Sequence, residues 1–200
     1  ITSYGRAATL CRQRTMEELR MLNEAGLKRL HVGLETGDEE LLRYINKGAA
    51  VEEMVKAGLK ALDAGFELTL YVILGLGGRD RSKKHAEETA RVLNKINPTH
   101  IRVRTLAIKP HTPLYEKMSS GEFKTASSLE VLKETRLLIQ NLNVTSHFYS
   151  DHVSNYLPIN GKLPEDQNQI LGYLDLVIDV LEASPELTKK ILTPEYLRYL

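Results

Sequence analysis

Residues 30–48, LHVGLETGDEELLRYINKG, read as a buried strand that passes through a glycine-flanked polar turn into an acidic helix start. Alternation along the strand places His31, Gly33 and Glu35 on one face. Val32 and Leu34 then lie on the opposite face. Acidic side chains in the first turn of the following helix suit the helix dipole. Because barrel enzymes place working residues at the carboxyl ends of strands, this stretch predicts the rim of a site.

The same order of strand and helix repeats along the chain. The expected strands cover residues 1–4, 28–35, 67–74, 100–108 and 143–149. The expected helices cover residues 15–25, 38–46, 51–64, 82–96, 113–118, 127–141, about 170–181 and 194–200. We predict an α/β fold in which parallel βα repeats form part of a (β/α)6 partial TIM-type barrel, followed by C-terminal helices. The periodicity alone does not separate a barrel from a doubly wound sheet, although the even spacing of strand ends favours the barrel.

The loop at residues 150–166 predicts a boundary between two parts of the chain. We expect a partial barrel at residues 1–149 and a C-terminal loop and helical extension at residues 150–200. Because the sequence opens with Ile1 inside an expected strand, we expect the barrel to be truncated at its amino end.

Composition limits the partners that the chain is expected to have. The 200 residues are 42% hydrophobic, which is enough for one sizeable core. With 27 basic and 26 acidic side chains, the net charge of +1 gives no reason to expect nucleic acid or membrane as a partner. No apolar run is long enough to span a bilayer and no signal peptide is evident, which predicts a cytoplasmic protein. A single cysteine, Cys11, excludes an internal disulfide and a multi-cysteine metal site made by this chain alone.

Three segments after expected strands carry special residues: GLETGDE at 33–39, ILGLGGRD at 73–80 and LAIKPHTPLYEKM at 106–118. In a parallel barrel all three face the same mouth. Glycine at a strand end lets the backbone approach a flat or phosphate-like ligand closely. Each motif alone is a weak signal, but their order and spacing together are specific.

With these motifs the chain resembles the radical S-adenosylmethionine (radical SAM) superfamily. GLETGDEELLRYINKG is similar to the fourth-strand segment of that family, ILGLGGRD to its fifth-strand motif and LAIKPHTPLYEKM to the run after its sixth strand. The tail DHVSNYLPINGKLPED is similar to the C-terminal segment of a subset called Fe–S oxidoreductases. The resemblance covers most of residues 1–181 and implies a chain that corresponds to the third strand onward of the partial barrel.

The resemblance also implies cofactors. Members bind a [4Fe–4S] cluster through a Cys-x-x-x-Cys-x-x-Cys loop, and S-adenosylmethionine is cleaved there to a 5′-deoxyadenosyl radical that abstracts hydrogen from a substrate. This sequence contains neither that loop nor the glycine-rich second-strand motif of the family. We therefore expect the parent protein to use both cofactors and the fragment to be inactive, with no cluster on its own cysteine. The substrate is not indicated by the sequence.

Three positions depart from the usual family motifs. Gly77 stands where proline is common, Arg79 where glutamate is common and His111 where glycine is common. Arg79 weakens the transfer of an acidic adenosine contact to this chain. These changes fit a divergent member of the family.

The resemblance implies that the cofactor is bound by Glu35, Thr36, Gly75, Gly77, Gly78 and Arg104. Glu35 and Thr36 would contact the ribose or methionyl part, since a carboxylate accepts hydrogen bonds from ribose hydroxyls. A capping or turn role ahead of the next helix is an equal alternative for Thr36. The glycines would pack against the adenine, or form a tight strand-to-helix turn that needs positive φ.

Two arginines, Arg102 and Arg104, alternate with apolar residues in the segment IRVRT. If the apolar side chains face the helices, both arginines face the barrel interior, where they need a partner. Glu35 and the carboxylate of the cofactor are the candidate partners, and exposure on an edge strand is the alternative. We favour a function for Arg104, and we expect His31 and Tyr71 to line the same cavity.

The remaining polar residues favour structural roles. His147, Asp151, His152 and Asn155 fit no standard zinc spacing, so we expect a loop held by side-chain hydrogen bonds. Cys11 has no identifiable base and is expected to be a small, half-buried residue. We expect the charged rows on the helices to face solvent.

Two other functions stay open at this point. One is a non-catalytic, barrel-type binding module. The other is a phosphate-binding TIM-type enzyme, in which the turn at residues 75–78 cradles a phosphate and Lys109 is the candidate Schiff-base lysine. The three motifs together favour the radical SAM interpretation over both.

Overall fold

Six strands form one open sheet in the computed structural model, which describes residues 1–184 and 186. Their order in the sheet is β1 (Thr2–Gly5), β2 (Arg29–Glu35), β3 (Glu67–Leu74), β4 (His100–Thr105), β5 (His147–Tyr149) and β6 (Asn160–Lys162). β1 to β5 are parallel, and β6 is antiparallel to β5. The strands lie side by side in chain order, without the reversal of a doubly wound sheet, so the sheet is the wall of a partial barrel.

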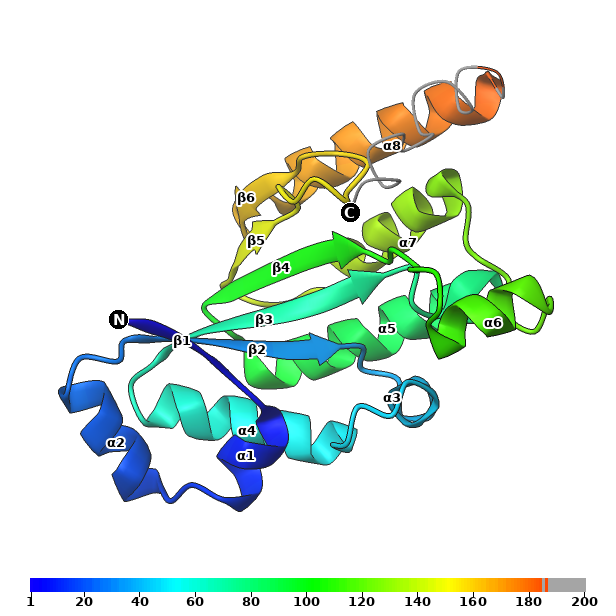
Figure 1. Ribbon diagram of the computed structural model, residues 1–200. Coiled ribbons are helices and arrows are strands. Elements are labelled where there is room, and N and C mark those ends of the chain that lie inside the picture. Colours follow the sequence, from blue (N-terminus) through cyan, green and yellow to red (C-terminus); the bar gives the residue numbers. More distant parts are fainter. Residues whose placement is uncertain (185, 187–200) are drawn as a thin grey trace.

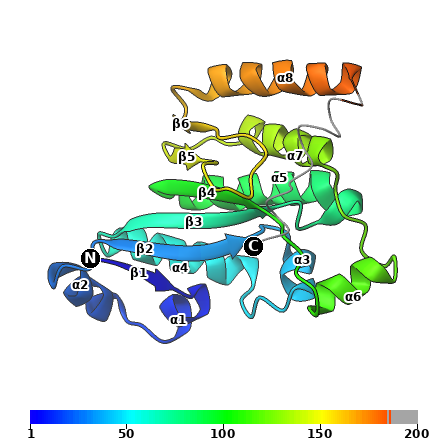
Figure 2. The same ribbon diagram turned by 45° about the horizontal axis from the view of Figure 1, so that its top comes forward.

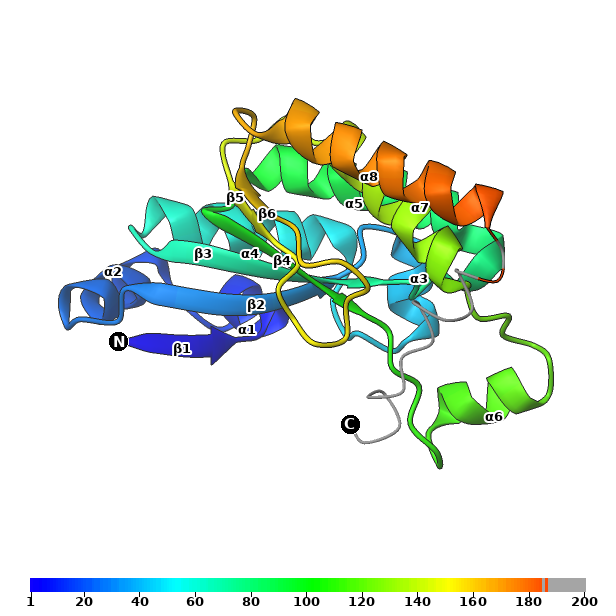
Figure 3. The same ribbon diagram turned by 90° about the horizontal axis from the view of Figure 1, so that it is seen from above.

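Helices follow the strands along the described part of the chain, and most of them lie along one face of this sheet (Figure 1). They are α1 (Ala7–Arg12), α2 (Met16–Glu24), α3 (Glu39–Tyr44), α4 (Val51–Asp63), α5 (Gly78–Ile96), α6 (Pro113–Ser119), α7 (Ser128–Gln140) and α8 (Gln167–Ala183). Neighbouring helices pack in the order α1, α4, α5, α7 and α8 (Figure 2). Figures 1 and 3 show that this layer leaves the opposite face of the sheet open. The predicted α/β fold of parallel βα repeats is confirmed.

The core lies between the sheet and the helices, as strand alternation requires. Its central strand residues are Leu30, Val32, Leu34, Leu68, Leu70, Val72, Leu74, Ile101 and Val103, all buried. The other side chains of these strands are mostly half-buried and lie on the open face. Every second side chain of β3 therefore packs against the helices. The side chains between them lie on the open face, where they can contribute to a site.

Several boundaries differ from the sequence predictions. α1 was not expected, because six residues are too few to show a helical period. α5 begins at Gly78 rather than near residue 82, since the glycine turn leads directly into the helix. The strand expected at 100–108 ends at Thr105, where the chain leaves the sheet.

The C-terminal third differs most. Only His147–Tyr149 of the strand expected at 143–149 pairs with β4. β6 lies inside the expected loop, because its sequence NGK has no strand propensity and pairing with β5 decides its conformation. The boundary between residues 1–149 and 150–200 stays a prediction, although α8 contributes Leu174 and Ile178 to the same core. The helix expected at 194–200 lies outside the described residues.

Candidate functional site

The carboxyl end of β2 holds Glu35 in an unusual backbone conformation. Its φ is 63°, in the left-handed region that residues other than glycine seldom adopt, and the pairing of β2 with β3 shifts between Gly33 and Glu35. The carboxylate lies over Gly33 on the open face, and Lys47 Nζ donates to Glu35 Oε1 at 2.6 Å. Strain of this kind persists only where the surroundings hold it, which marks Glu35 as a candidate site residue.

The turn after β2 is held by its own polar side chains. Thr36 is fully buried; its hydroxyl accepts from the Asp38 amide at 3.0 Å and hydrogen bonds to His85 Nδ1 at 2.7 Å. Asp38 caps α3 and pairs with Arg81 at 2.6 Å. Burial alone would raise the pKa of Asp38, but the Arg81 and backbone hydrogen bonds bring the pKa below its ordinary value. Thr36 thus has the structural role foreseen as its alternative, and a cofactor contact stays a prediction.

The glycine turn after β3 has the positive φ angles expected at two of its three positions. Gly75 has φ 76° and Gly78 has φ 60°, whereas Gly77 has φ −74° and needs no left-handed backbone. The amide of Gly75 donates to Glu134 Oε1 at 2.6 Å, and the amide of Gly78 donates to the carbonyl of Gly75 at 3.0 Å. These N–H groups are therefore not presented to a phosphate.

Glu134 on α7 was missed, because the charged rows of the helices were expected to face solvent. Its side chain is 2% exposed; Oε2 accepts from Ser82 Oγ at 2.5 Å, and Oε1 lies 3.6 Å from His85 Nε2. Burial raises the pKa of Glu134 to about 7 and lowers the pKa of His85 to about 4. The helical period could have found it, since Glu134 shares a face with Val131 and Leu138.

Together these groups form a buried polar cluster beneath the strand ends, in which His85 Nε2 and Glu134 Oε1 are in contact at 3.6 Å without a hydrogen bond. It runs from Thr36 through His85 and Glu134 to the amide of Gly75. The turns after β2 and β3 are thereby fixed against the same helix, α5. The network positions both candidate segments without presenting its own polar atoms to a ligand.

A pocket of roughly 310 Å³ opens at the carboxyl ends of β3 and β4. Its lining is Gly75, Thr105, Leu106, Ala107, Ile108, Met118, Thr125, Ala126, Val131 and Tyr156. Most of these side chains are apolar, and Thr105, Thr125 and Tyr156 add hydroxyl groups, which suits a flat ring with hydrogen-bonding edges. We refer to this hollow as the mouth pocket.

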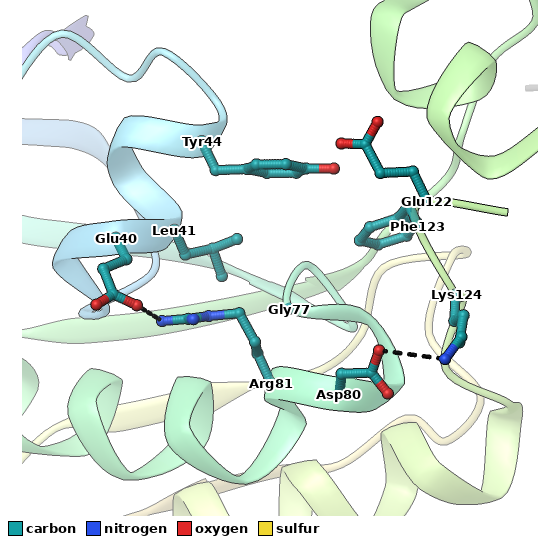
Figure 4. Close-up of a pocket in the computed structure, with 9 residues that line it drawn as sticks. All are labelled: Glu40, Leu41, Tyr44, Gly77, Asp80, Arg81, Glu122, Phe123 and Lys124. Atoms are coloured by element: carbon teal, nitrogen blue, oxygen red, sulfur yellow. Dashed lines mark hydrogen bonds and ion pairs between the residues drawn. The ribbon is translucent and has the colours of Figure 1, made fainter. Parts of the chain in front are cut away.

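A second pocket, of roughly 280 Å³, lies between α3, the start of α5 and the segment before α7 (Figure 4). Figure 4 shows Arg81 turned to Glu40 and Asp80 turned to Lys124, at 2.5 Å and 3.7 Å. Its basic groups are thus already paired with acidic ones. Gly77 lines this pocket whereas Gly75 lines the mouth pocket, so the structure separates two of the predicted glycines.

The arginines of β4 lie on the open face, as the alternation predicted. Arg102 pairs with Asp151 at 3.2 Å and its guanidinium lies 4.9 Å from the ring centre of Tyr149. Arg104 is exposed and its guanidinium lies 4.9 Å from the ring centre of Tyr71. Glu35 as their protein partner was wrong, because Lys47 takes that carboxylate.

The predicted neighbours of the arginines are also on this face. His31 Nδ1 and the Tyr71 hydroxyl are 3.0 Å apart. The loop after β5 is held by side-chain hydrogen bonds, as expected: Asn155 donates to the carbonyl of Val103 at 2.8 Å, and His152 Nδ1 lies 2.8 Å from Ser154 Oγ. No group of three or more metal-ligating side chains occurs within residues 1–184 and 186. No helix in the same part of the chain is long and apolar enough to cross a membrane.

A sequentially ordered, mostly parallel sheet with a pocket and a strained carboxylate at its strand ends defines a partial-barrel α/β protein with a candidate site at the mouth. Residues 6–93 match the sequence model of the Radical SAM superfamily. The finer likeness to Fe–S oxidoreductases stays a prediction.

Curated relatives match parts of the chain. The heme chaperone HemW of Bacillus subtilis is 30% identical over 106 residues, which are 52% of this chain and 27% of that protein. A tRNA uridine(34) acetyltransferase of Methanocaldococcus jannaschii is 23% identical over 140 residues, 68% of this chain and 26% of that protein. The chain thus spans about a quarter of the length of these relatives.

Solved structures share the fold. An archaeal Elp3 from Methanocaldococcus infernus with an N-terminal deletion superposes with a TM-score of 0.63 at 18% identity, covering 88% of this chain and 41% of that one. The coproporphyrinogen III oxidase HemN of Escherichia coli gives a TM-score of 0.52 at 22% identity, covering 70% and 32%. At these identities the likeness concerns the partial-barrel fold.

Proposed function

We propose that this chain is the part of a radical SAM enzyme that holds the nucleoside and methionyl portions of S-adenosylmethionine. In this family the cofactor and a [4Fe–4S] cluster supply a 5′-deoxyadenosyl radical for hydrogen abstraction. One observation carries the proposal: in a chain that matches this family, Glu35, the turn at Gly75 and the segment after β4 gather at the carboxyl ends of three neighbouring strands.

The residues fit one cofactor and not the other. The mouth pocket offers apolar and backbone surface for a flat nucleobase, and Glu35 offers a carboxylate on the open face at the end of the neighbouring strand β2. A cluster of this kind needs three thiolates, whereas the sequence has only Cys11. These 200 residues therefore cannot supply the three thiolates by themselves, and the contribution that we propose for the chain is to bind and orient S-adenosylmethionine.

Each candidate residue has a role in this proposal. Glu35 accepts hydrogen bonds from the ribose hydroxyls, and the backbone at Gly75 lies against the adenine. Arg104 has no carboxylate partner within residues 1–184 and 186, so its guanidinium is suited to the methionyl carboxylate. Thr36 and Gly78 act through the turns that they hold, and Gly77 lies toward the second pocket.

The reaction and substrate of the whole protein are not transferred from the relatives. Their names concern two tetrapyrroles, heme and coproporphyrinogen III, and a tRNA uridine, so they do not indicate one substrate. Of the two alternative functions, the phosphate-binding enzyme is disfavoured because Glu134 takes the Gly75 amide. The non-catalytic binding module is the outcome to be excluded by experiment.

The test is anaerobic reconstitution of the full-length protein with iron and sulfide, followed by measurement of 5′-deoxyadenosine formed from S-adenosylmethionine. We expect Glu35→Ala to slow this cleavage by roughly tenfold or more, since a hydrogen bond to a charged group is lost. The control is Glu52→Ala, an exposed carboxylate on α4, which should leave the rate unchanged.

Two results would count against the proposal. Unaltered cleavage by the Glu35→Ala variant would remove Glu35 from the site. The second result is an unaltered protein that carries its full complement of iron but forms no 5′-deoxyadenosine. That result would favour the non-catalytic binding module over the enzyme.

A further inference from the structure

The open face of the sheet carries a continuous group of rings and guanidinium groups. We call it the ring-and-arginine face, and it consists of Tyr4, His31, Tyr71, Arg102, Arg104 and Tyr149. These residues come from β1, β2, β3, β4 and β5, and the helical layer lies on the opposite side of the sheet (Figures 1 and 3). We propose that this face binds a planar aromatic ligand that carries anionic groups.

The rings are close enough to act as one platform. The ring centres of Tyr4 and His31 are 5.2 Å apart, and those of His31 and Tyr71 are 5.6 Å apart. The rings of Tyr4 and Tyr71 are inclined by only 27° to each other. Tyr4 is 75% exposed, so the platform is open to an incoming ring. Aromatic surfaces of this kind favour flat, polarisable ligands.

The charge of the face favours an anion. Arg102 and Arg104 bring two positive charges, and Asp151 neutralises one of them through Arg102. Arg104 is exposed, its guanidinium lies 4.9 Å from the ring centre of Tyr71, and it has no carboxylate partner in the described part of the chain. A guanidinium has two donor edges, so a carboxylate or phosphate on the ligand can bind Arg104 on one edge while the methionyl carboxylate of the cofactor binds on the other, and the ring of the ligand stacks beside it.

One buried ring nitrogen supports the same ligand. His31 Nε2 is buried and has no hydrogen-bond partner within the described part of the chain, while Nδ1 is engaged with Tyr71. Burial first, and then Arg29 and Arg102, lower the pKa of His31, so the imidazole is neutral near pH 7. A polar atom of a bound ligand would satisfy Nε2, which otherwise remains an unpaired buried group.

This proposal rests on the proposed function in one respect. If the chain belongs to an enzyme whose cofactor binds at the mouth, a ligand on the ring-and-arginine face belongs to the substrate class of that enzyme. Its test needs neither cluster nor S-adenosylmethionine. Loss of binding on this face therefore leaves the cleavage assay as a separate question, and the absence of cleavage leaves the binding result standing.

The experiment compares three probes by calorimetric titration of the 200-residue protein. Naphthalene-2-sulfonate has the ring and the anion, 2-naphthol has the ring alone, and cyclohexanesulfonate has the anion alone. For a ligand of this size we expect naphthalene-2-sulfonate to bind with a Kd on the order of 1 mM or below. We expect the other two probes to bind at least several-fold more weakly. Equal binding of all three probes, or no saturable binding of the first, would overturn the proposal.

Substitutions then locate the bound probe. We expect Arg104→Gln and Tyr71→Leu each to weaken naphthalene-2-sulfonate binding about fivefold or more, in line with a charge-assisted hydrogen bond and a stacking contact. The matched control is Arg91→Gln, an exposed, ion-paired arginine on α5 on the helical side. An equal loss in the Arg91→Gln variant, or no loss in the Arg104→Gln variant, would show that binding is non-specific. Arg104 is exposed, so its replacement is not expected to disturb folding.

Discussion

Glu134 shows how a single buried carboxyl group connects the strand ends. It holds the Gly75 amide and the Ser82 hydroxyl, and through His85 it is linked to Thr36. Burial keeps Glu134 largely protonated below pH 7 and keeps His85 neutral above pH 4. The pair therefore positions two turns without a buried charge across the pH range from 4 to 7.

The sign of the pH dependence follows for each group. Glu134 titrates at 4.5 in the unfolded chain and at about 7 in the fold, so its contribution to stability is lost as pH rises between these values. His85 titrates at 6.5 unfolded and at about 4 folded, so its contribution increases as pH rises from 4 to 6.5. In the unaltered protein the two contributions oppose each other.

Replacing Glu134 by glutamine removes one of these contributions. The free energy of unfolding of the Glu134→Gln variant is compared with that of the unaltered protein at each pH. We expect this difference to shift in favour of the variant by about 3 kcal/mol when the pH is raised from about 4.5 to about 8. The measurement is the free energy of unfolding in urea at both pH values. Glu52→Gln, on the exposed face of α4, is the control and should show no such change. A Glu134→Gln effect that is independent of pH would contradict the burial of an un-ionised carboxyl group.

Among the elements, β2 and β3 could be predicted well because their residues obey strand alternation and end at glycine-containing turns. The expected strands at 28–35 and 67–74 agree with the structure to within a residue. The capping box of Thr15 and the cap at Asp38 also begin the helices where expected. Local sequence is sufficient where a cap and an apolar period point to the same boundary.

Other elements depend on contacts that the sequence does not show. β6 exists through its pairing with β5, and the shift in β2 follows from the left-handed backbone at Glu35. The partner of Glu35 is Lys47, twelve residues further on, rather than an arginine of β4. Of the candidate site, the segments could therefore be predicted, whereas the pairing of the side chains and the network at Glu134 could not.

The turn after β2 makes a close contact with α5 that a single methyl group should break. A Cβ on Gly37 would lie 2.7 Å from the Cα of Thr89, and backbone cannot move aside as a flexible side chain can. We expect Gly37→Ala to destabilise the fold by about 1–3 kcal/mol. Thermal or urea unfolding measures the change.

Gly172 in α8 is the matched control for this substitution. A Cβ there meets no atom within 4 Å, and alanine favours a helix interior. Gly172→Ala should therefore stabilise the protein by about 0.5–1 kcal/mol. Equal effects at Gly37 and Gly172 would contradict the close packing of the turn on α5.

For the whole molecule, one sheet separates two kinds of surface. One face is covered by helices and supplies the core, and the other presents rings, arginines and Glu35 beside the mouth pocket. The order of the strands brings three segments, distant in sequence, to the same end of the sheet. The match of residues 6–93 to the Radical SAM superfamily and this geometry both support our proposal that S-adenosylmethionine binds at this end of the sheet.

The most direct measurement is an NMR titration of the isotopically labelled 200-residue protein with S-adenosylmethionine. Without the thiolate-bound cluster that holds its methionine end, the ligand should bind weakly, and the largest shifts should fall on the amides of Gly75, Leu106 and Ile108 in the mouth pocket. Saturating shifts confined to other parts of the chain, or no shifts at millimolar ligand, would contradict the account.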